Sequence, residues 1–338
     1  MRTERLSKEQ ISRAAEILKN GGLVAIPTET VYGLAANAFD KEAIRKIFLA
    51  KGRPMDNPLI VHIADIQMLS KLVADFPKTA KKLSETFWPG PLTMILPKSE
   101  KIPDEVSAGL PTVAIRRPSH PVALELIKVS GLPLAAPSAN RSGSPSPTTA
   151  QHVLSDLDGQ IDAVLDGGPC SVGLESTVIA LEGNTPRILR PGGVTAEQIS
   201  EVIGKIEIDD AVFHQLSSLE KASSPGMKYK HYAPKAKVVL IKADRENYIR
   251  FVNGHASDQT AALCFEEDVS ELSVYAIAYG KVDQPQEQAK NLFSALRRFD
   301  QLKNVKTIYA HSPDRKGISM AVYNRLIRAA GFEVLELG

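Results

Sequence analysis

The sequence contains little cysteine, no strong excess of charge and no long apolar run. Its two cysteines, Cys170 and Cys264, stand far apart and neither belongs to a CxxC pair. We therefore expect both to be reduced and structural, and we predict neither a disulfide framework nor a metal site built by the protein. The net charge of +2 is too small for a dedicated nucleic-acid-binding domain. No stretch approaches the ~20 apolar residues that span a bilayer, so a cytoplasmic protein with no membrane contact is expected.

Several familiar signatures of catalysis are also missing. The sequence has no GxxxxGK[ST] phosphate loop, no HExxH metal motif, no GxSxG elbow, no kinase signature and no GxGxxG dinucleotide fingerprint. Any phosphate chemistry would therefore use dispersed Lys, Arg, Ser and Asn side chains in place of one glycine-rich cradle.

The chain is long enough for two hydrophobic cores, because 338 residues exceed the ~250–300 at which a single core stops growing. Strand-like runs alternate with helical patterns, which predicts an α/β fold. We predict three parts: a first domain at 1–205 with a large twisted, open, mixed sheet flanked by helices, a linker at 206–236, and a smaller Rossmann-like α/β domain at 237–338 with a largely parallel sheet.

Two polar segments near the start are candidate ligand contacts. Thr28 and Thr30 lie in the loop after the strand predicted at 23–27, where they could bind a ligand or merely cap their own backbone. Lys51 and Arg53 flank Gly52 at the end of a predicted helix. Two cations separated by a flexible glycine suit a polyphosphate, although a basic helix terminus that offsets the helix dipole is an equal alternative.

Three further segments present groups of the same kind. Arg116 lies in an apolar strand, where a guanidinium is costly unless it meets an anion or a structural salt bridge. A strand of small residues leads into a loop with Ser138, Asn140 and Ser146, which could donate to phosphate or ribose oxygens or form a plain Ser/Pro loop. Arg190 ends another strand and is a second candidate anion contact.

Taken in order, these motifs closely resemble the threonylcarbamoyl-AMP synthase (YrdC-like) family in its longer form with a C-terminal domain. The resemblance is carried by PTETVYGLA at 27–35, KGRP at 51–54, the following NPL and His62, TVAIRRP at 112–118, APSAN at 136–140, ESTV at 175–178, RPG at 190–192 and SPGMKYKHYAP at 224–234. It covers residues 1 to about 205 and the linker strongly, and the remainder by position and general pattern.

The resemblance implies a nucleotidyltransferase. L-threonine, bicarbonate and ATP, with Mg2+ as cofactor, would give threonylcarbamoyl-AMP and pyrophosphate. The product would pass to a tRNA threonylcarbamoyl-transferase complex for modification of adenosine beside the anticodon. The fold implied has a basic concave face, on which double-stranded RNA is a further expected partner.

The resemblance also implies a role for each candidate residue. Lys51 and Arg53 would offset charge on the phosphates. Threonine would contact Thr30, His62, Arg116, Ala136 and Ser176. ATP would contact Arg53, Asn57, Thr112, Ser138, Asn140, Ser146, Arg190 and Tyr232.

Tyr232 would reach ATP only if the linker folds back over the cleft as a lid, whereas the alternative is a passive tether. Two rival functions stay open: RNA binding without catalysis, and carbamoyl transfer in hydrogenase maturation. The second expects cysteine-rich zinc segments, and the two lone cysteines oppose it.

Overall fold

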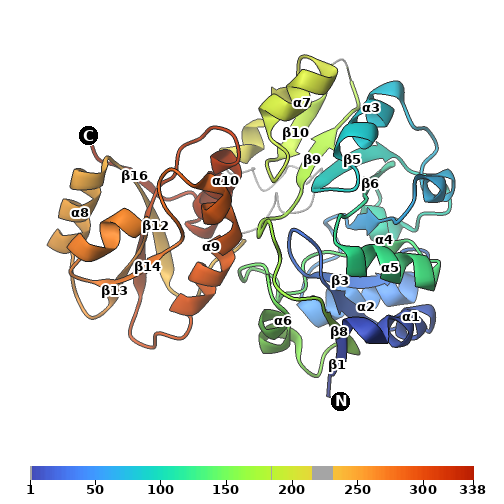
Figure 1. The fold of residues 1–338 in the computed structure, drawn as a ribbon, viewed down its shortest axis with the longest axis horizontal. Coiled ribbons are helices and arrows are strands. Elements are labelled where there is room, and N and C mark those ends of the chain that lie inside the picture. The colour runs from blue at the N-terminus through green and yellow to red at the C-terminus, as the bar shows by residue number, and fades with distance from the viewer. Residues whose placement is uncertain (1, 184, 215–230) are drawn as a thin grey trace.

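The structure is a computed structural model that describes residues 2–183, 185–214 and 231–338. These residues form two lobes, each built around its own sheet (Figure 1). In the described residues no helix is both long and apolar enough to cross a membrane.

The first lobe is built on a mixed sheet. In the described residues it has eleven strands in the order β1-β8-β2-β3-β7-β4-β6-β5-β9-β10-β11. Strands β4 and β6 pair in parallel, whereas β5 and β6 pair antiparallel, so the prediction of a mixed sheet is confirmed. The strands are β1 (Glu4–Ser7), β2 (Val24–Ile26), β3 (Gly33–Asn37), β4 (Ile60–His62), β5 (Leu92–Pro97), β6 (Thr112–Arg116), β7 (Leu134–Ala135), β8 (Ala163–Asp166), β9 (Thr177–Ala180), β10 (Arg187–Arg190) and β11 (Glu207–Ile208).

Helices cover both faces of this sheet. Along β2, Ala25 packs in one buried cluster while Val24 and Ile26 pack in another, because successive side chains of a strand point to opposite faces. The cluster of Val24 and Ile26 includes side chains of α1 and α5, and the other includes side chains of α2, α3, α6 and α7. The helices are α1 (Ile11–Lys19), α2 (Lys41–Lys51), α3 (Lys78–Phe87), α4 (Asp104–Ser107), α5 (Pro121–Ser130), α6 (Ala150–Leu157) and α7 (Ala196–Ile203), with 3-10 turns η1 (Lys8–Gln10), η2 (Ile66–Lys71) and η3 (Asp210–Val212).

The second lobe has a parallel sheet, as the sequence predicts. Its order in the described residues is β14-β13-β15-β12-β16, and each neighbouring pair is parallel. Its core is split between the two faces, with α8 packing in one cluster and α9 and α10 in the other. The elements are β12 (Lys237–Lys242), α8 (Arg245–Gly254), β13 (Thr260–Cys264), η4 (Glu266–Glu271), β14 (Tyr275–Ala278), α9 (Pro285–Phe299), β15 (Thr307–His311), α10 (Ser319–Ala329) and β16 (Val334–Glu336).

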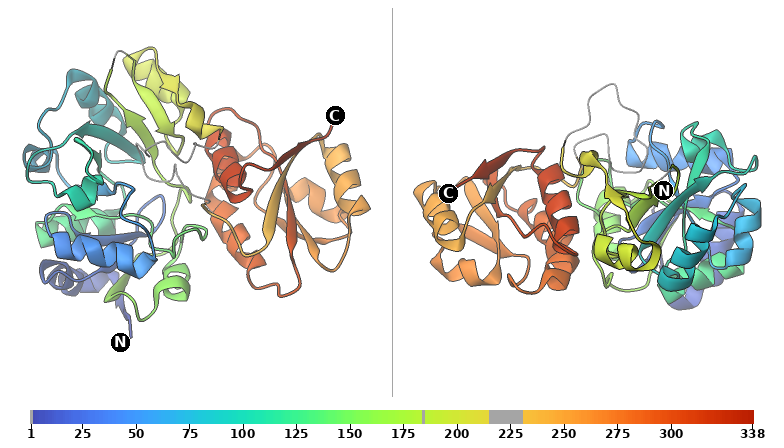
Figure 2. Two further views of the ribbon diagram at one scale, coloured as in Figure 1. Left: turned by 180° about the vertical axis from the view of Figure 1, so that it is seen from behind. Right: turned by 90° about the horizontal axis from the view of Figure 1, so that it is seen from above.

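Helices α9 and α10 lie on the side of the second lobe that faces the first (Figures 1 and 2). Val31 and Leu174 of the first lobe belong to the same buried cluster as the inner residues of these helices. A side chain could not be added at Gly173, because its Cβ would come within 2.5 Å of Lys290 Cα on α9. The two lobes therefore share one packed boundary.

The described start of the predicted linker belongs to the first lobe. Glu207 and Ile208 form β11, which pairs in parallel with β10. The following turn η3 is held by α10, since Asn324 Nδ2 donates to Val212 O at 2.7 Å. Residues 215–230, on which most of the lid hypothesis depends, lie outside the described residues.

Candidate active site

One open cavity gathers most of the residues singled out in the sequence. Its empty volume, including space open to solvent, is about 760 Å³. Loops after β2 and β7, the end of α2, the strands β4 and β6, the segment before β9 and the end of β10 form its walls. The predicted site residues that line it are Thr30, Lys51, Arg53, His62, Arg116, Ala136, Ser138, Asn140, Ser146, Ser176, Arg190 and Tyr232.

Strand pairing explains why such distant residues meet. His62 and Arg116 end the parallel strands β4 and β6 and are direct partners in the register. Leu134 of β7 pairs with His62, so the chain leaving β7 passes the same edge and carries Ser138 and Asn140 there. Ligands of open α/β sheets usually bind at such an edge.

The two threonines of the loop after β2 make different contacts. Thr28 Oγ1 donates to Val31 O at 2.6 Å and lies 3.2 Å from the amides of Thr30 and Val31, which is the local cap considered from the sequence. Thr30 instead accepts from Arg116 Nη1 at 2.8 Å. Thr30 therefore orients the guanidinium.

Arg116 also forms the buried salt bridge that the sequence left as an alternative. Its Nη2 lies 2.7 Å from Glu29 Oε1, with both side chains buried. Burial alone would raise the pKa of Glu29, but Arg116 outweighs this effect and the pKa is lowered. A guanidinium has five N–H donors, so the contacts to Thr30 and Glu29 leave others for a carboxylate.

Lys51 is almost fully buried and points into the site. Its Nζ donates to Ser138 O at 2.5 Å and to Asn140 O at 2.7 Å. It therefore joins the end of α2 to the loop after β7, so its contacts go beyond offsetting the helix dipole. Burial, followed by the nearby charge of Arg53, lowers the pKa of Lys51 to about 7.

Arg190 and Ser176 form a second polar group across the cavity. Arg190 donates from Nε to Ser176 O at 3.1 Å and from Nη2 to Ser176 Oγ at 3.2 Å. Ser176 Oγ also lies 2.8 Å from Thr93 Oγ1. Gly192 permits this arrangement, because a Cβ there would come within 2.3 Å of Thr177 N.

Two histidines of the cavity are uncharged at neutral pH. Burial, then Arg116, lowers the pKa of His62 to about 3, and burial, then Arg53, lowers the pKa of His231 to about 3. In the described structure His62 Nδ1 is buried without a hydrogen-bond partner. Buried polar atoms are normally paired, so this nitrogen is available to a ligand.

Two predicted ATP contacts do not line the cavity. Thr112 begins β6 and lines a different hollow with Pro111 and Leu189. Alternation places it on the same side of the strand as Arg116, but four residues of strand separate the two by about 13 Å. Asn57 is fully buried, and its carbonyl accepts from Arg53 Nη2 at 3.2 Å. Asn57 therefore contacts Arg53, which lines the cavity. The position of Thr112 gives no support for a contact with ATP in this cavity.

Two further residues of the cavity are not among those predicted from the sequence. Glu175 lines the cavity beside Ser176, and its Oε1 accepts the hydroxyl of Ser146. His231 lines it next to Tyr232. Both residues stand in motifs that the sequence analysis quoted, but a motif assigns no partner, so the contacts required the structure.

In the described part of the chain, no cluster of three or more His, Cys, Asp or Glu residues is suited to a metal ion. The acidic side chain of the cavity, Glu175, is engaged by Ser146 and by Arg325 Nε at 2.8 Å. A Mg2+ ion, which takes few protein ligands when it accompanies a nucleotide, would be held mainly by phosphate oxygens.

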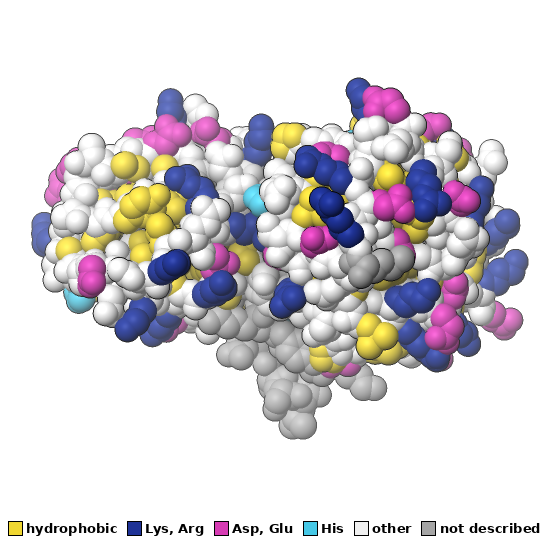
Figure 3. Space-filling model, turned by 90° about the horizontal axis from the view of Figure 1, so that it is seen from below, with side chains coloured by type: hydrophobic (Ala, Val, Ile, Leu, Met, Phe, Trp, Pro, Cys, Tyr) yellow, Lys and Arg dark blue, Asp and Glu magenta, His cyan; other side chains and the backbone are white. Residues whose placement is uncertain are grey.

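One face of the molecule carries charges of both signs. On the face in Figure 3, Lys and Arg side chains are interspersed with Asp and Glu side chains over both lobes. This face therefore has no continuous basic patch of the kind that binds nucleic acid.

Comparison with known proteins agrees with the motifs. Residues 16–192 match the Sua5/YciO/YrdC family model, described as telomere recombination, and residues 194–331 match the model described as threonylcarbamoyl-AMP synthase, C-terminal domain. The threonylcarbamoyl-AMP synthase of Pyrococcus abyssi is 45% identical, covering 99% of this chain and 98% of that protein. The Bacillus subtilis enzyme of the same name is 48% identical, covering 96% of this chain and 94% of the relative.

A solved structure shares the whole fold. The crystal structure of P. abyssi Sua5 complexed with L-threonine has a TM-score of 0.92 and 42% identity, and each chain covers 100% of the other. Motifs, family models and fold agree over both lobes. The chain belongs to the threonylcarbamoyl-AMP synthase family and is an enzyme of the nucleotidyltransferase type.

Proposed function

We propose that this chain converts L-threonine, bicarbonate and ATP into threonylcarbamoyl-AMP and pyrophosphate. The observation that carries the proposal is the division of one cavity into two chemically distinct parts. Thr30, His62 and Arg116 form a pocket suited to an amino acid, and Lys51, Arg53 and Arg190 form a cationic region suited to a triphosphate. The threonine bound to the P. abyssi relative supports the first assignment.

In the amino-acid pocket, the unused donors of Arg116 pair with the threonine carboxylate, which a guanidinium binds well. Neutral His62 adds no charge that would repel the amine, and Ala136 and Ser176 line the remaining wall. The uncharged amine attacks bicarbonate, with loss of water, or CO2, with loss of a proton from the nitrogen, and forms a carbamate.

In the nucleotide region, a carbamate oxygen attacks the α-phosphorus of ATP. The bond from the α-phosphorus to the bridging oxygen breaks, and pyrophosphate leaves. Lys51, Arg53 and Arg190 offset charge on the phosphates, and Ser138, Asn140, Ser146 and Tyr232 position the nucleotide. Mg2+ carried by the phosphates neutralises part of their charge.

The product is a mixed anhydride suited to transfer of its threonylcarbamoyl group. We place its consumer in a tRNA threonylcarbamoyl-transferase complex that modifies adenosine beside the anticodon, in the cytoplasm. Direct binding of double-stranded RNA is a separate proposal, which predicts salt-dependent RNA affinity of this chain alone.

Pyrophosphate release, measured with each substrate omitted in turn, tests the reaction. We expect release only when threonine, bicarbonate and ATP are all present. Undiminished release without threonine or without bicarbonate would contradict the proposal, and RNA affinity without any threonine-dependent turnover would favour the rival function.

A further inference from the structure

The cavity contains an acidic side chain that would work against its proposed ligand. Among the described residues that line it, the charged side chains are the cations Lys51, Arg53, Arg116 and Arg190 and a single carboxylate, Glu175. Glu175 is buried. An uncompensated carboxylate in such a place would repel a triphosphate strongly, because charges interact with little screening away from water.

The second lobe supplies the compensating charge. Arg325 lies on α10, is 0% exposed, and donates from Nε to Glu175 Oε2 at 2.8 Å. The rest of its guanidinium holds the backbone on either side, with Nη1 donating to Pro191 O at 2.9 Å and Nη2 to Glu175 O at 3.3 Å. Arg325 is absent from the cavity lining, so it neutralises Glu175 from behind.

This pairing also orients a group inside the cavity. With Oε2 of Glu175 taken by Arg325, the other oxygen, Oε1, accepts the hydroxyl of Ser146. Ser146 is fully buried and lines the cavity. Its direction is thus set through Glu175 by a residue of the other lobe.

Neighbouring contacts hold the same loop against the second lobe. Gly173 touches the backbone of α9, and Leu174 is buried among residues of α9 and α10. Tyr232 lies between the lobes, with Phe293 at 5.2 Å between ring centroids and Arg325 Cζ at 5.6 Å from its ring centroid. Docking of the second lobe and the shape of the cavity are therefore coupled.

We propose that Arg325 is a positioning residue of the ATP site, through which the C-terminal lobe neutralises Glu175 and fixes Ser146 for the nucleotide. This inference deepens the proposed function and rests on it. It assigns the second lobe an indirect part in nucleotide binding, exerted through Glu175 and Ser146 of the first lobe.

The test compares Arg325→Met, Arg325→Lys and Glu175→Gln with the unaltered protein. Arg325→Met leaves Glu175 charged and uncompensated, so we expect the KM for ATP to rise about tenfold or more, with a smaller change for threonine. Arg325→Lys keeps the charge and should recover part of the loss. Glu175→Gln removes the repelling charge, and the double variant Glu175→Gln, Arg325→Met should bind ATP more tightly than Arg325→Met alone.

The directions of these changes in the KM for ATP distinguish a positioning role of Arg325 from a purely structural one. If Arg325 only held the lobes together, Glu175→Gln would break the same contact and raise the KM for ATP as Arg325→Met does, and the double variant would recover nothing. Either result would overturn the inference. Arg328→Met is the matched control, because Arg328 is a buried arginine of α10 that holds a different part of the first lobe, donating from Nη2 to Ala211 O of η3 at 2.7 Å. We expect its KM for ATP to stay within about twofold.

Folding and the proposed reaction are checked in the same experiment. Thermal unfolding identifies variants that do not fold, and calorimetric titration with ATP measures binding without turnover. If the unaltered protein binds ATP but lacks threonine-dependent pyrophosphate release, the proposed function fails while the ATP affinities still decide the role of Arg325. If Arg325→Met and the unaltered protein bind ATP equally, the inference fails whatever the turnover.

Discussion

Both lobes place polar side chains at the ends of parallel strands, but the contacts of these side chains differ. In the first lobe, His62 and Arg116 at the ends of β4 and β6 face an open cavity. In the second lobe, His311 at the end of β15 donates from Nδ1 to Asp268 Oδ2 at 2.8 Å and lies 3.3 Å from Ala243 O through Nε2. The first group has donors left for a ligand, and the second is closed on itself.

Packing makes the difference between the two groups. His311 stacks on Tyr248 with 4.1 Å between ring centroids, and Asp268 is 1% exposed. In the cavity, by contrast, His62 Nδ1 has no partner in the described structure. A Rossmann-like sheet thus provides a suitable edge, but only unsatisfied polar groups beside open space make that edge a site.

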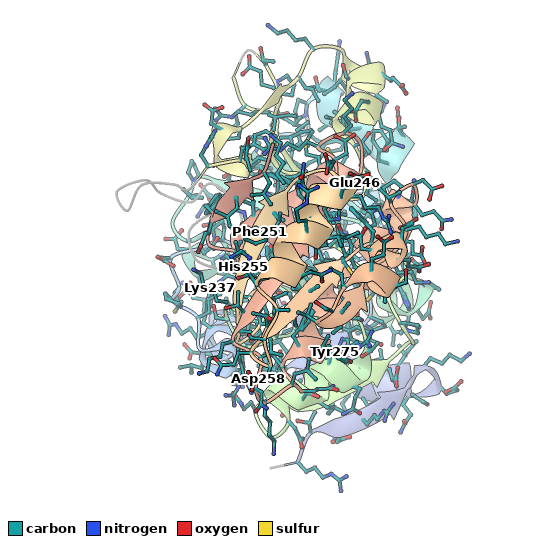
Figure 4. All side chains as sticks on the ribbon, turned by 90° about the vertical axis from the view of Figure 1, so that its left-hand side faces the viewer. Lys237, Glu246, Phe251, His255, Asp258 and Tyr275 are labelled. Carbon is teal, nitrogen blue, oxygen red and sulfur yellow. The ribbon has the colours of Figure 1, made fainter. Side chains whose placement is uncertain are left out.

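The outer side of the second lobe is also far from the chemistry. Figure 4 views this side and labels Phe251 and His255, which belong to α8 and the residue after it and have ring centroids 4.2 Å apart. Helix α8 lies on the sheet face opposite α9 and α10. Substitutions here therefore serve as controls for those in the cavity.

The largest expected effect comes from removing the cations of the cavity. Lys51→Ala and Arg53→Ala should each lower the rate of pyrophosphate release about 100- to 1,000-fold, since loss of one preorganised donor typically costs ~2.7–4 kcal/mol. Arg245→Ala in the second lobe, whose Nη2 pairs with Glu271 Oε1 at 2.5 Å, is the control and should stay within about twofold. An equal loss of rate in Arg245→Ala would contradict the claim that only the first lobe carries the cations of the active site.

A substitution of Arg116 should affect the proposed amino-acid pocket more than the proposed nucleotide region. Arg116→Lys keeps a charge but loses the planar fork, so the KM for threonine should rise about 10- to 100-fold while the KM for ATP changes less than about threefold. Steady-state kinetics with each substrate varied in turn measures this. Equal changes in both constants would mean that Arg116 does not belong to a separate amino-acid pocket.

The closed cluster of the second lobe should affect stability and not chemistry. Removing one partner of a buried pair typically costs about 3–5 kcal/mol, so Asp268→Ala should lower the free energy of unfolding by that order. The rate per folded molecule should remain within about twofold of the unaltered protein. Denaturant unfolding and active-site titration provide the two measurements, and a lost rate in a fully folded variant would refute a purely structural cluster.

The smallest expected effect is on pH dependence. The pKa of Lys51 is lowered from 10.5 to about 7, chiefly by burial, so Lys51 loses its charge as pH rises through about 7. Between pH 6 and 8, the KM for ATP of the unaltered protein should therefore rise a few-fold more than that of Lys51→Met. Parallel pH profiles of the KM for ATP in the two proteins would contradict the assignment.

The same pKa shift affects stability. Between pH 7 and 10.5 the folded state binds fewer protons than the unfolded state, so the contribution of Lys51 to stability increases with pH in that window.

Much of the fold could be predicted from the sequence because its patterns are local. The helical apolar spacing at 78–87 forms α3, and the residues that begin at Ser7 and at Thr195 form capping boxes. The edge strand β1 is hard to predict, since Glu4–Ser7 has one buried residue, Leu6, and pairs with β8 more than 150 residues away.

The site was predictable through its motifs but not through its long-range contacts. The family resemblance pointed to Arg116, Lys51 and Ser146 before any geometry was available. Nothing in the sequence indicated that Arg325 would meet Glu175, because the pair is 150 residues apart and α10 resembles an ordinary amphipathic helix. Thr112 is the converse case, because its motif predicts an ATP contact whereas the residue lines a different hollow.

The most direct test of the account is to identify the product formed in the cavity. The protein is incubated with threonine, ATP and 13C-bicarbonate, and the adenylate is isolated and analysed by mass spectrometry. We predict a product that contains one threonine, one 13C atom and AMP, and that is absent with Arg53→Ala. An adenylate that lacks the labelled carbon, or AMP alone, would contradict the claim that this cavity joins all three substrates.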